Sequence, residues 1–103
     1  MSVKKVYVKI SSLTDDQKAE YTYMRGVANL SAENYKEAKA DFDKAIALGL
    51  DSTELHYNAA VAALALEDYE AAKKELEIAA GRKDNAELAK SAKEMLEAIK
   101  SAQ

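Results

Sequence analysis

The 103-residue sequence contains no cysteine and no proline, and only three glycines: Gly26, Gly49 and Gly81. Without cysteine the chain can form neither a disulfide nor a thiolate metal site. A chain with so few turn-forming residues cannot easily supply the tight hairpins of an all-β fold. The composition therefore favours long helices joined by short polar links, in a chain whose length fits one domain.

Long apolar runs are also missing. No stretch approaches the roughly 18 apolar residues of a membrane-spanning helix. The first ten residues interrupt their apolar positions with Lys4, Lys5 and Lys9, which is not the continuous apolar core of a secretory signal. We therefore expect no membrane partner and favour a soluble, cytoplasmic protein, whether whole or excised from a larger one.

Basic residues are scarce in the body of the chain. Residues 1–12 hold three lysines and no acid, whereas residues 13–86 hold 15 acids against 9 bases. Residues 87–103 balance three acids against three bases. Nucleic-acid binding needs a basic stripe that neutralises phosphates. The acidic body therefore predicts no nucleic-acid partner.

A repeat is present. Residues 19–52 align without a gap to residues 53–86, and ten of the 34 positions are identical. The identical pairs include Glu20/Glu54, Tyr23/Tyr57, Val27/Val61, Leu30/Leu64 and Tyr35/Tyr69. Similarity that keeps its register over a whole unit indicates an internal structural repeat.

Each unit is expected to form two helices. A capping box at 14–17 opens the first, which runs to about Leu30. Its apolar positions are Tyr21, Met24, Val27, Ala28 and Leu30. A turn at 31–34 leads to a second helix that ends at about Leu48, where Gly49 can adopt the left-handed conformation that closes a helix. The apolar stripe of this second helix is Tyr35, Ala38, Phe42, Ala45 and Ile46.

The second unit repeats this pattern, with Asp51/Ser52 as cap and Gly81 as terminator. Its second helix carries the stripe Tyr69, Ala72, Leu76 and Ala79. A further capping box at 84–87 opens a last helix over 87–101, with apolar positions Leu88, Ala92, Met95, Leu96 and Ile99. A stack of repeats needs a cover for its last hydrophobic face, and this helix is placed to provide it.

Residues 1–13 fit two patterns. Helical spacing is met by Val3, Val6, Tyr7, Ile10 and Leu13, and strand alternation by Val6, Val8 and Ile10. We favour a short helix that packs on the first repeat, because the sequence offers no second strand for pairing.

The two units resemble the tetratricopeptide repeat. Counted from residues 19 and 53, small residues match at position eight (Gly26, Ala60), position twenty (Ala38, Ala72) and position twenty-seven (Ala45, Ala79), and large ones at position twenty-four (Phe42, Leu76). The departures are Thr22 and His56 at position four, Arg25 and Ala59 at position seven, and the absence of the terminal proline.

The resemblance implies an all-α fold: a short superhelix of two helix-turn-helix repeats plus a C-terminal capping helix, in a domain over 14–103. It also implies a concave groove that grips peptides or partner proteins. The positions that would line the groove, with one clamp position added, are Glu20, Tyr23, Val27, Leu30, Glu54, Tyr57, Asn58, Val61 and Leu64. Family members that bind chaperone tails hold them with a basic clamp, and of its positions Asn58 alone matches here.

No constellation for catalysis, cofactor binding or metal binding is visible. No recognised spacing fixes a serine, a cysteine or an acid beside His56, so we expect it to fill space in a partly buried position. We expect Glu37, Asp41 and Asp43 to lie on a solvated surface with i,i+4 ion pairs.

The sequence thus predicts a protein-interaction module, not an enzyme, that binds an apolar or basic peptide or partner helix in its groove. A structural role is the main alternative, in which the apolar end helices form a homodimer. An alanine-rich, proline-free sequence also suits a designed repeat scaffold with no natural ligand.

Overall fold

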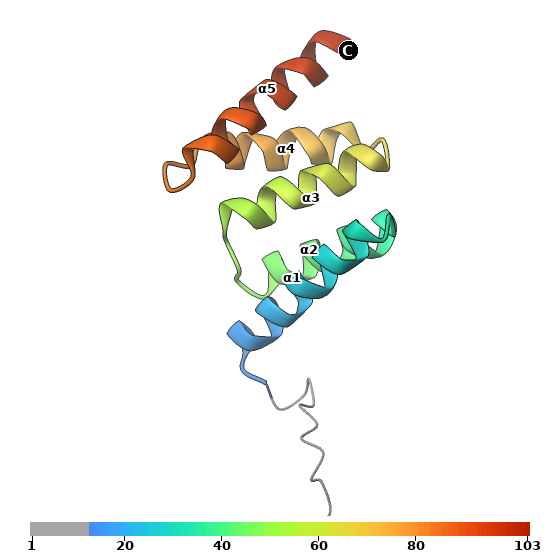
Figure 1. Cartoon of the computed structure of the whole chain (residues 1–103), viewed down its shortest axis with the longest axis vertical. Helices are drawn as coiled ribbons and strands as arrows, with labels where there is room; N and C mark the ends of the chain where they lie inside the picture. Colours follow the sequence, from blue (N-terminus) through green and yellow to red (C-terminus); the bar gives the residue numbers. More distant parts are fainter. Residues whose placement is uncertain (1–12) are drawn as a thin grey trace, which may run out of the picture.

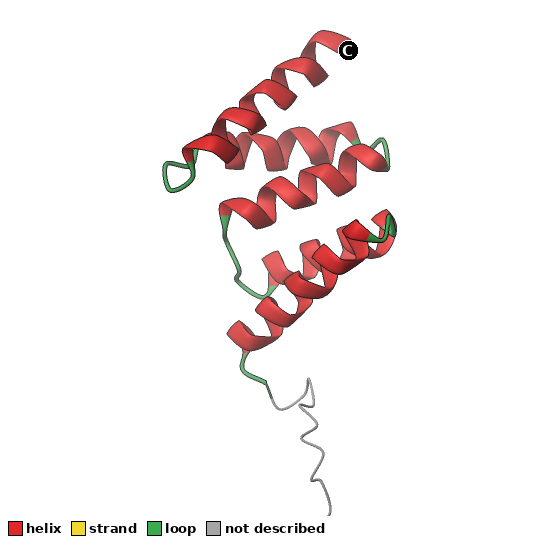
Figure 2. Cartoon of the chain, viewed as in Figure 1, coloured by secondary structure: helices red, strands yellow, loops and turns green. Residues whose placement is uncertain are grey.

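The computed structural model describes residues 13–103, which form five helices (Figure 1). They are α1 (Asp15–Ser31), α2 (Tyr35–Ala47), α3 (Thr53–Ala65), α4 (Tyr69–Ala80) and α5 (Ala86–Ala102). Figure 2 shows helices joined by short loops, with no strand in this range. The all-α prediction is confirmed. The expected helix over residues 1–13 lies, apart from Leu13, outside the described residues.

The helices pack in chain order as pairs. The closest packing joins α1 to α2 and α3 to α4, and α5 packs on α4. Contacts also join α1 to α3 and α3 to α5. Helices α1, α3 and α5 therefore form a first layer and α2 and α4 a second layer behind it (Figure 1). This is the repeat-like arrangement that the 34-residue period predicts.

Side-chain caps begin four of the helices, and in α4 the cap is Asp68, whose Oδ1 accepts a hydrogen bond from the Ala71 amide at 3.2 Å. Thr14 Oγ1 accepts a hydrogen bond from the Gln17 amide at 3.2 Å, and Gln17 Oε1 accepts one from the Thr14 amide at 3.0 Å. This is the predicted capping box. Ser52 caps α3 in the same way, through the Leu55 amide. For α5 the expected box at 84–87 is wrong by one residue, because Asn85 is the cap and accepts from the Leu88 amide.

The loops between helices use left-handed backbone at repeated positions. Glu33 and Glu67, which are 34 residues apart, have φ of 63° and 59° in the turns that join the two helices of each hairpin. Gly49 ends α2 with φ of 104°, as predicted. Gly81 ends α4, as predicted, but its φ of −85° is not the left-handed conformation that Gly49 adopts. The chain leaves α4 along a right-handed path that other residues can also adopt.

The core consists of two clusters in which alanines lie against a few large side chains. The first cluster contains Ala38, Phe42, Ala45, Leu55, Ala59 and Ala62. The second contains Ala60, Ala63, Ala72, Leu76, Ala79, Ala92 and Ile99. Small residues let helix axes approach closely, and the large ones fill the remaining space.

The apolar face predicted for α1 is only partly buried. Tyr21 is 47% exposed and Met24 is 68% exposed. The residues of α1 that are buried are Ala19, Thr22 and Gly26. In the described stack the main neighbours of α1 are α2 and α3, and the residues of α1 that are buried are small ones, next to Tyr21 and Met24 along the helix. The expectation that Tyr21 and Met24 belong to the buried stripe is therefore wrong.

An acid on the second helix of each repeat pairs with a base on the first helix. In the first repeat, Arg25 Nη2 lies 2.8 Å from Asp41 Oδ1. In the second, His56 Nδ1 lies 3.1 Å from Glu75 Oε2. Asp41 and Glu75 occupy the same repeat position. We call these contacts the acid–base pairs; they account for Arg25 and His56 standing where the tetratricopeptide pattern has apolar residues.

The structure corrects two sequence-based expectations at these pairs. Asp41 is buried, not part of a solvated surface, and also accepts a hydrogen bond from Asn29 at 3.0 Å. His56 is buried as expected, but two acids lie beside it, since its Nε2 is 2.6 Å from Asp51 Oδ1. The predicted i,i+4 pairing on α2 is found at Lys39–Asp43, at 2.9 Å. Spacing along the chain could not reveal pairs that form between helices.

The first prediction concerns Gly26. A Cβ at this position would lie 2.7 Å from Phe42 Cε1 and 3.1 Å from Asp41 Cβ. Gly26→Ala is therefore expected to destabilise the fold by about 1–3 kcal/mol through overpacking, although alanine is the better helix former by up to about 1 kcal/mol. Chemical denaturation followed by circular dichroism measures the change.

Gly81→Ala is the matched control. Its Cβ would meet only the Glu77 and Ile78 carbonyl oxygens, both at 3.6 Å. The backbone there suits alanine, so this variant should be neutral or stabilised by up to about 1 kcal/mol. Equal effects of the two substitutions would contradict the close helix approach at Gly26.

Candidate functional site

The nine predicted groove residues all lie on α1 and α3, which are neighbours in the first layer. Glu20 and Glu54 are exposed. The other seven are half-buried: Tyr23, Val27, Leu30, Tyr57, Asn58, Val61 and Leu64. The structure thus brings the predicted residues onto adjacent helices, where all the apolar members except Val61 pack partly against a core cluster and remain partly accessible. We call this set the interaction face.

Tyr23 links the two repeats. Its ring packs on Phe42, with 5.8 Å between ring centroids. Its hydroxyl accepts a hydrogen bond from Asn58 Nδ2 at 3.0 Å. The Asn58 amide, which the sequence comparison matched to one position of the tetratricopeptide carboxylate clamp, is therefore engaged within the protein. This bond holds α1 and α3 side by side at the interaction face.

The environment of Tyr23 raises the pKa of its hydroxyl above the usual value of about 10. Burial of the phenol is the largest cause, and the carboxylates of Glu54 and Glu20 add to it. The hydrogen bond from Asn58 acts in the opposite direction. The two glutamates therefore set a negative local potential around the tyrosine, in addition to lying on the same face.

Helix α5 continues the interaction face. Tyr57 and Leu64 pack against the second core cluster together with Met95 and Leu96 of α5. Met95 stands 34 residues after Val61, so its position follows from extending the repeat offset once more. The same offset leads from Glu54 to Leu88, which is also half-buried. The 34-residue offset is therefore the sequence signal by which Leu88 and Met95 can be assigned to the same face.

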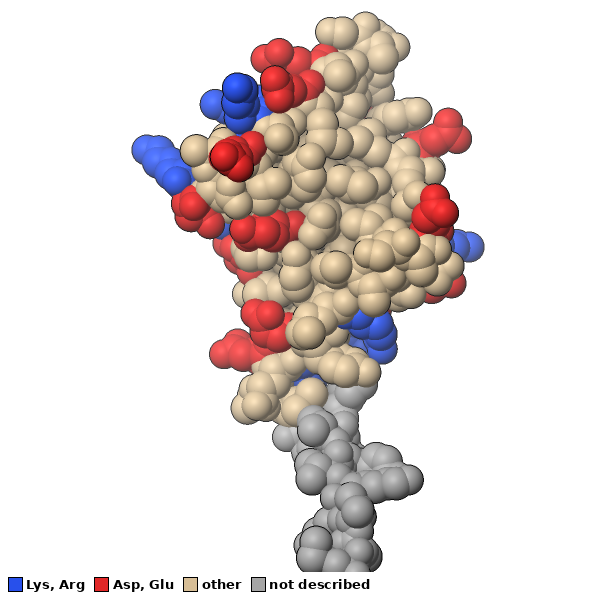
Figure 3. All heavy atoms as spheres, viewed as in Figure 1, with Lys and Arg blue, Asp and Glu red and all other residues tan. Residues whose placement is uncertain are grey.

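Charge is sparse over the first layer. In Figure 3, viewed as in Figure 1, the middle of this side of the molecule is mostly uncharged, and acidic and basic residues lie along its two edges. Helix α3 contains no lysine or arginine. Within the interaction face Glu20 and Glu54 are the charged members. The face is therefore apolar with acidic residues at its margin.

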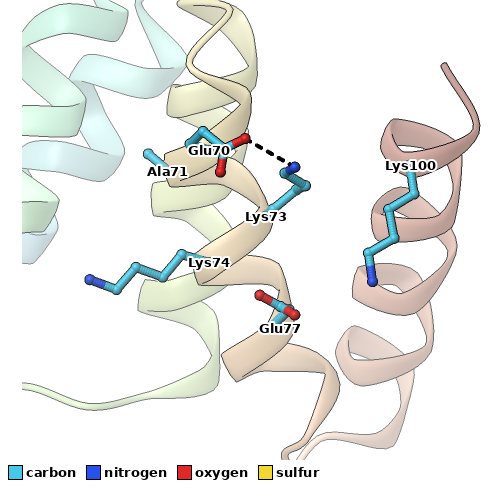
Figure 4. Close-up of a pocket in the computed structure, with 6 residues that line it drawn as sticks. All are labelled: Glu70, Ala71, Lys73, Lys74, Glu77 and Lys100. Carbon is cyan, nitrogen blue, oxygen red and sulfur yellow. Dashed lines mark ion pairs between the residues drawn. The ribbon is translucent and has the colours of Figure 1, made fainter. Parts of the chain in front are cut away.

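The main hollows on the described part of the chain lie elsewhere. One hollow, of about 510 Å³, runs between α4 and α5 and is lined by Glu70, Ala71, Lys73, Lys74, Glu77 and Lys100 (Figure 4). Lys73 pairs with Glu70 at 3.1 Å, and in Figure 4 Lys74 points away from α5. Three basic and two acidic side chains line this crevice, so neither sign of charge dominates there. We regard it as a weaker candidate than the interaction face.

A second hollow, of about 350 Å³, is lined by Tyr69, Ala98, Ile99, Ala102 and Gln103 and is mainly apolar. It lies where α4 begins and α5 ends. None of its residues belongs to the interaction face.

Within residues 13–103, no group of three or more histidine, aspartate and glutamate side chains is arranged to hold a metal ion. In the same range, no helix combines the length and the apolar character needed to cross a bilayer. Comparison of the sequence with known proteins finds no matching family model and no matching curated protein.

The second prediction follows from the raised pKa of Tyr23. The folded chain holds the phenol proton more tightly than the unfolded chain does, so this contribution to stability is intact below about pH 10 and is lost as pH rises through the folded pKa. Tyr23→Phe removes this alkaline loss, while at neutral pH it costs about 1 kcal/mol because Asn58 loses its acceptor.

Urea denaturation of both proteins at several pH values between about 8 and 11 measures the difference. We expect the difference in unfolding free energy between the wild type and Tyr23→Phe to shrink as the pH increases. Tyr69→Phe, on an exposed ring, is the control. A wild-type advantage that stays constant across this range would contradict the description of the Tyr23 site.

Proposed function

We propose that this chain is a protein-interaction module of the tetratricopeptide type, which holds a peptide or partner helix against the interaction face. One observation carries the proposal: two in-register repeats present half-exposed tyrosines and aliphatic side chains on adjacent helices. Tyr57 and Tyr23 combine a large apolar ring with a polar tip, and such side chains are enriched at binding hot spots.

Several features favour binding over catalysis. The one histidine is buried, and both its ring nitrogens lie within hydrogen-bond distance of carboxylates. The interaction face itself is mainly apolar, and its tyrosines and aliphatic residues are half-buried, which suits contact with a partner's apolar side chains. Pairing of the tyrosine hydroxyl with Asn58 also supports a preorganised surface, because it limits movement of Tyr23 before a partner arrives.

The third prediction tests this site. A displayed library of 18-residue peptides is selected on the immobilised full chain, and enriched peptides are titrated by fluorescence anisotropy. Tyr57→Ala is expected to weaken their binding at least about tenfold, because it removes a central aromatic contact. Circular dichroism under the same conditions shows whether the variant remains folded.

Tyr69→Ala makes the same change on α4, away from the interaction face, and should leave the affinity within about twofold. If no peptide is enriched, or if the two variants weaken binding equally, the proposed site is wrong.

Self-association is a second candidate function, favoured by the exposure of Tyr21 and Met24 on α1. These side chains lie on the part of α1 that α2 and α3 leave uncovered. Contact between two copies through this helix would remove them from water.

The fourth prediction concerns self-association through α1. Sedimentation is then expected to show a dimer for the wild type and a monomer for Met24→Glu, because burial of an unpaired charge opposes the contact. A wild type that remains monomeric at high concentration would exclude this role.

A further inference from the structure

We infer that the ligand of the interaction face is an amphipathic segment whose apolar stripe is bordered by lysine or arginine. The inference rests on the proposed function and specifies the chemistry of the partner. It is carried by the arrangement of charges in the described residues.

The acids of the interaction face occupy repeated positions. Glu20 on α1 and Glu54 on α3 stand 34 residues apart and are both exposed. Glu54 Oε2 accepts a hydrogen bond from Asn85 Nδ2 at 3.1 Å, which fixes the direction of that side chain. Within residues 13–103 neither carboxylate takes part in an ion pair. Both carboxylates therefore remain able to pair with a cation of a ligand.

Helix α3 contains no lysine or arginine, and α1 contains Lys18 and Arg25. Arg25 of α1 is bound to Asp41 through two of its nitrogens. On the second layer, Lys39 pairs with Asp43 and Lys73 with Glu70. The described range holds 18 acids and 12 bases, because three of the 15 bases lie in residues 1–12. Acids therefore outnumber bases in the described range, and none of its bases forms an ion pair with Glu20 or Glu54.

The physical consequence is selectivity by charge sign. A ligand that buries its apolar side chains between Tyr23 and Tyr57 places its flanking residues near Glu20 and Glu54. Partial exclusion of water strengthens the attraction of these carboxylates for a cation. An acidic flank at the same place meets like charge close to an apolar surface, which disfavours its binding.

The test uses the full chain and the 18-residue peptides that selection enriches. We expect lysine or arginine beside the apolar positions of these peptides. One enriched peptide is then synthesised in three forms that share the apolar stripe and carry lysine, glutamine or glutamate at the flanking positions. At low salt the lysine form should bind roughly tenfold more tightly than the glutamine form, and the glutamate form should be weakest. The advantage should diminish in high salt.

Matched variants locate the effect. Glu20→Gln/Glu54→Gln should remove most of the preference for lysine over glutamine. Glu70→Gln/Glu77→Gln removes the same number of charges from exposed positions on α4 and should retain the preference. Because the two double variants have equal net charge, a difference between them reports the position of the carboxylates and not the overall field.

Each result decides a different point. Equal binding of the lysine and glutamine forms, or equal effects of the two double variants, would overturn this inference and leave the proposed function intact. The absence of any enriched peptide would instead remove the proposed function itself. If Lys4→Gln/Lys5→Gln/Lys9→Gln increased the affinity for the lysine form, the chain's own residues 1–12 would be the occupant, and the inference of an external basic partner would be wrong.

Discussion

The close contact between α1 and α2 at Gly26 is the constraint on which the rest of the structure depends. The ring of Phe42 occupies the space that a larger side chain at residue 26 would need. Alanines take the equivalent role in the second repeat, where Ala60 lies in a core cluster with Leu76. Small residues on the first helix and large ones on the second let each hairpin close, and closed hairpins can stack with α1, α3 and α5 in a single layer.

The acid–base pairs follow from this stacking. Both repeats place an acid at the same position of the second helix, but its partner comes from different positions of the first helix, Arg25 in one repeat and His56 in the other. The two partner positions are three residues apart in the repeat, which is nearly one helical turn, so both can reach the facing helix. In each repeat the acid on the second helix thus has a partner on the first helix, although the partner is a different side chain. The pair with Asp41 also directs Arg25 toward α2.

The interaction face is itself a result of the two-layer arrangement. Side chains of the first layer that lie between neighbouring helices cannot be fully covered by either one, which leaves Tyr23 and Tyr57 half-buried. The buried side of Tyr23 stabilises the contact with Phe42, and its hydroxyl joins the repeats through Asn58. The same side chains therefore stabilise the stack and keep part of their surface accessible, so under the proposed function stability and binding are coupled at these positions.

The sequence by itself determined the five helices, their order and the 34-residue period, because capping residues and helical periodicity act over a few neighbouring positions. The resemblance to the tetratricopeptide repeat implied that the proposed site lies on the first helix of each repeat. Only the tertiary structure decided that Asp41 is buried and that Tyr21 and Met24 are exposed. Burial depends on which face a neighbouring helix covers, and a rotation of α1 by one residue changes that face while leaving the local pattern unaltered.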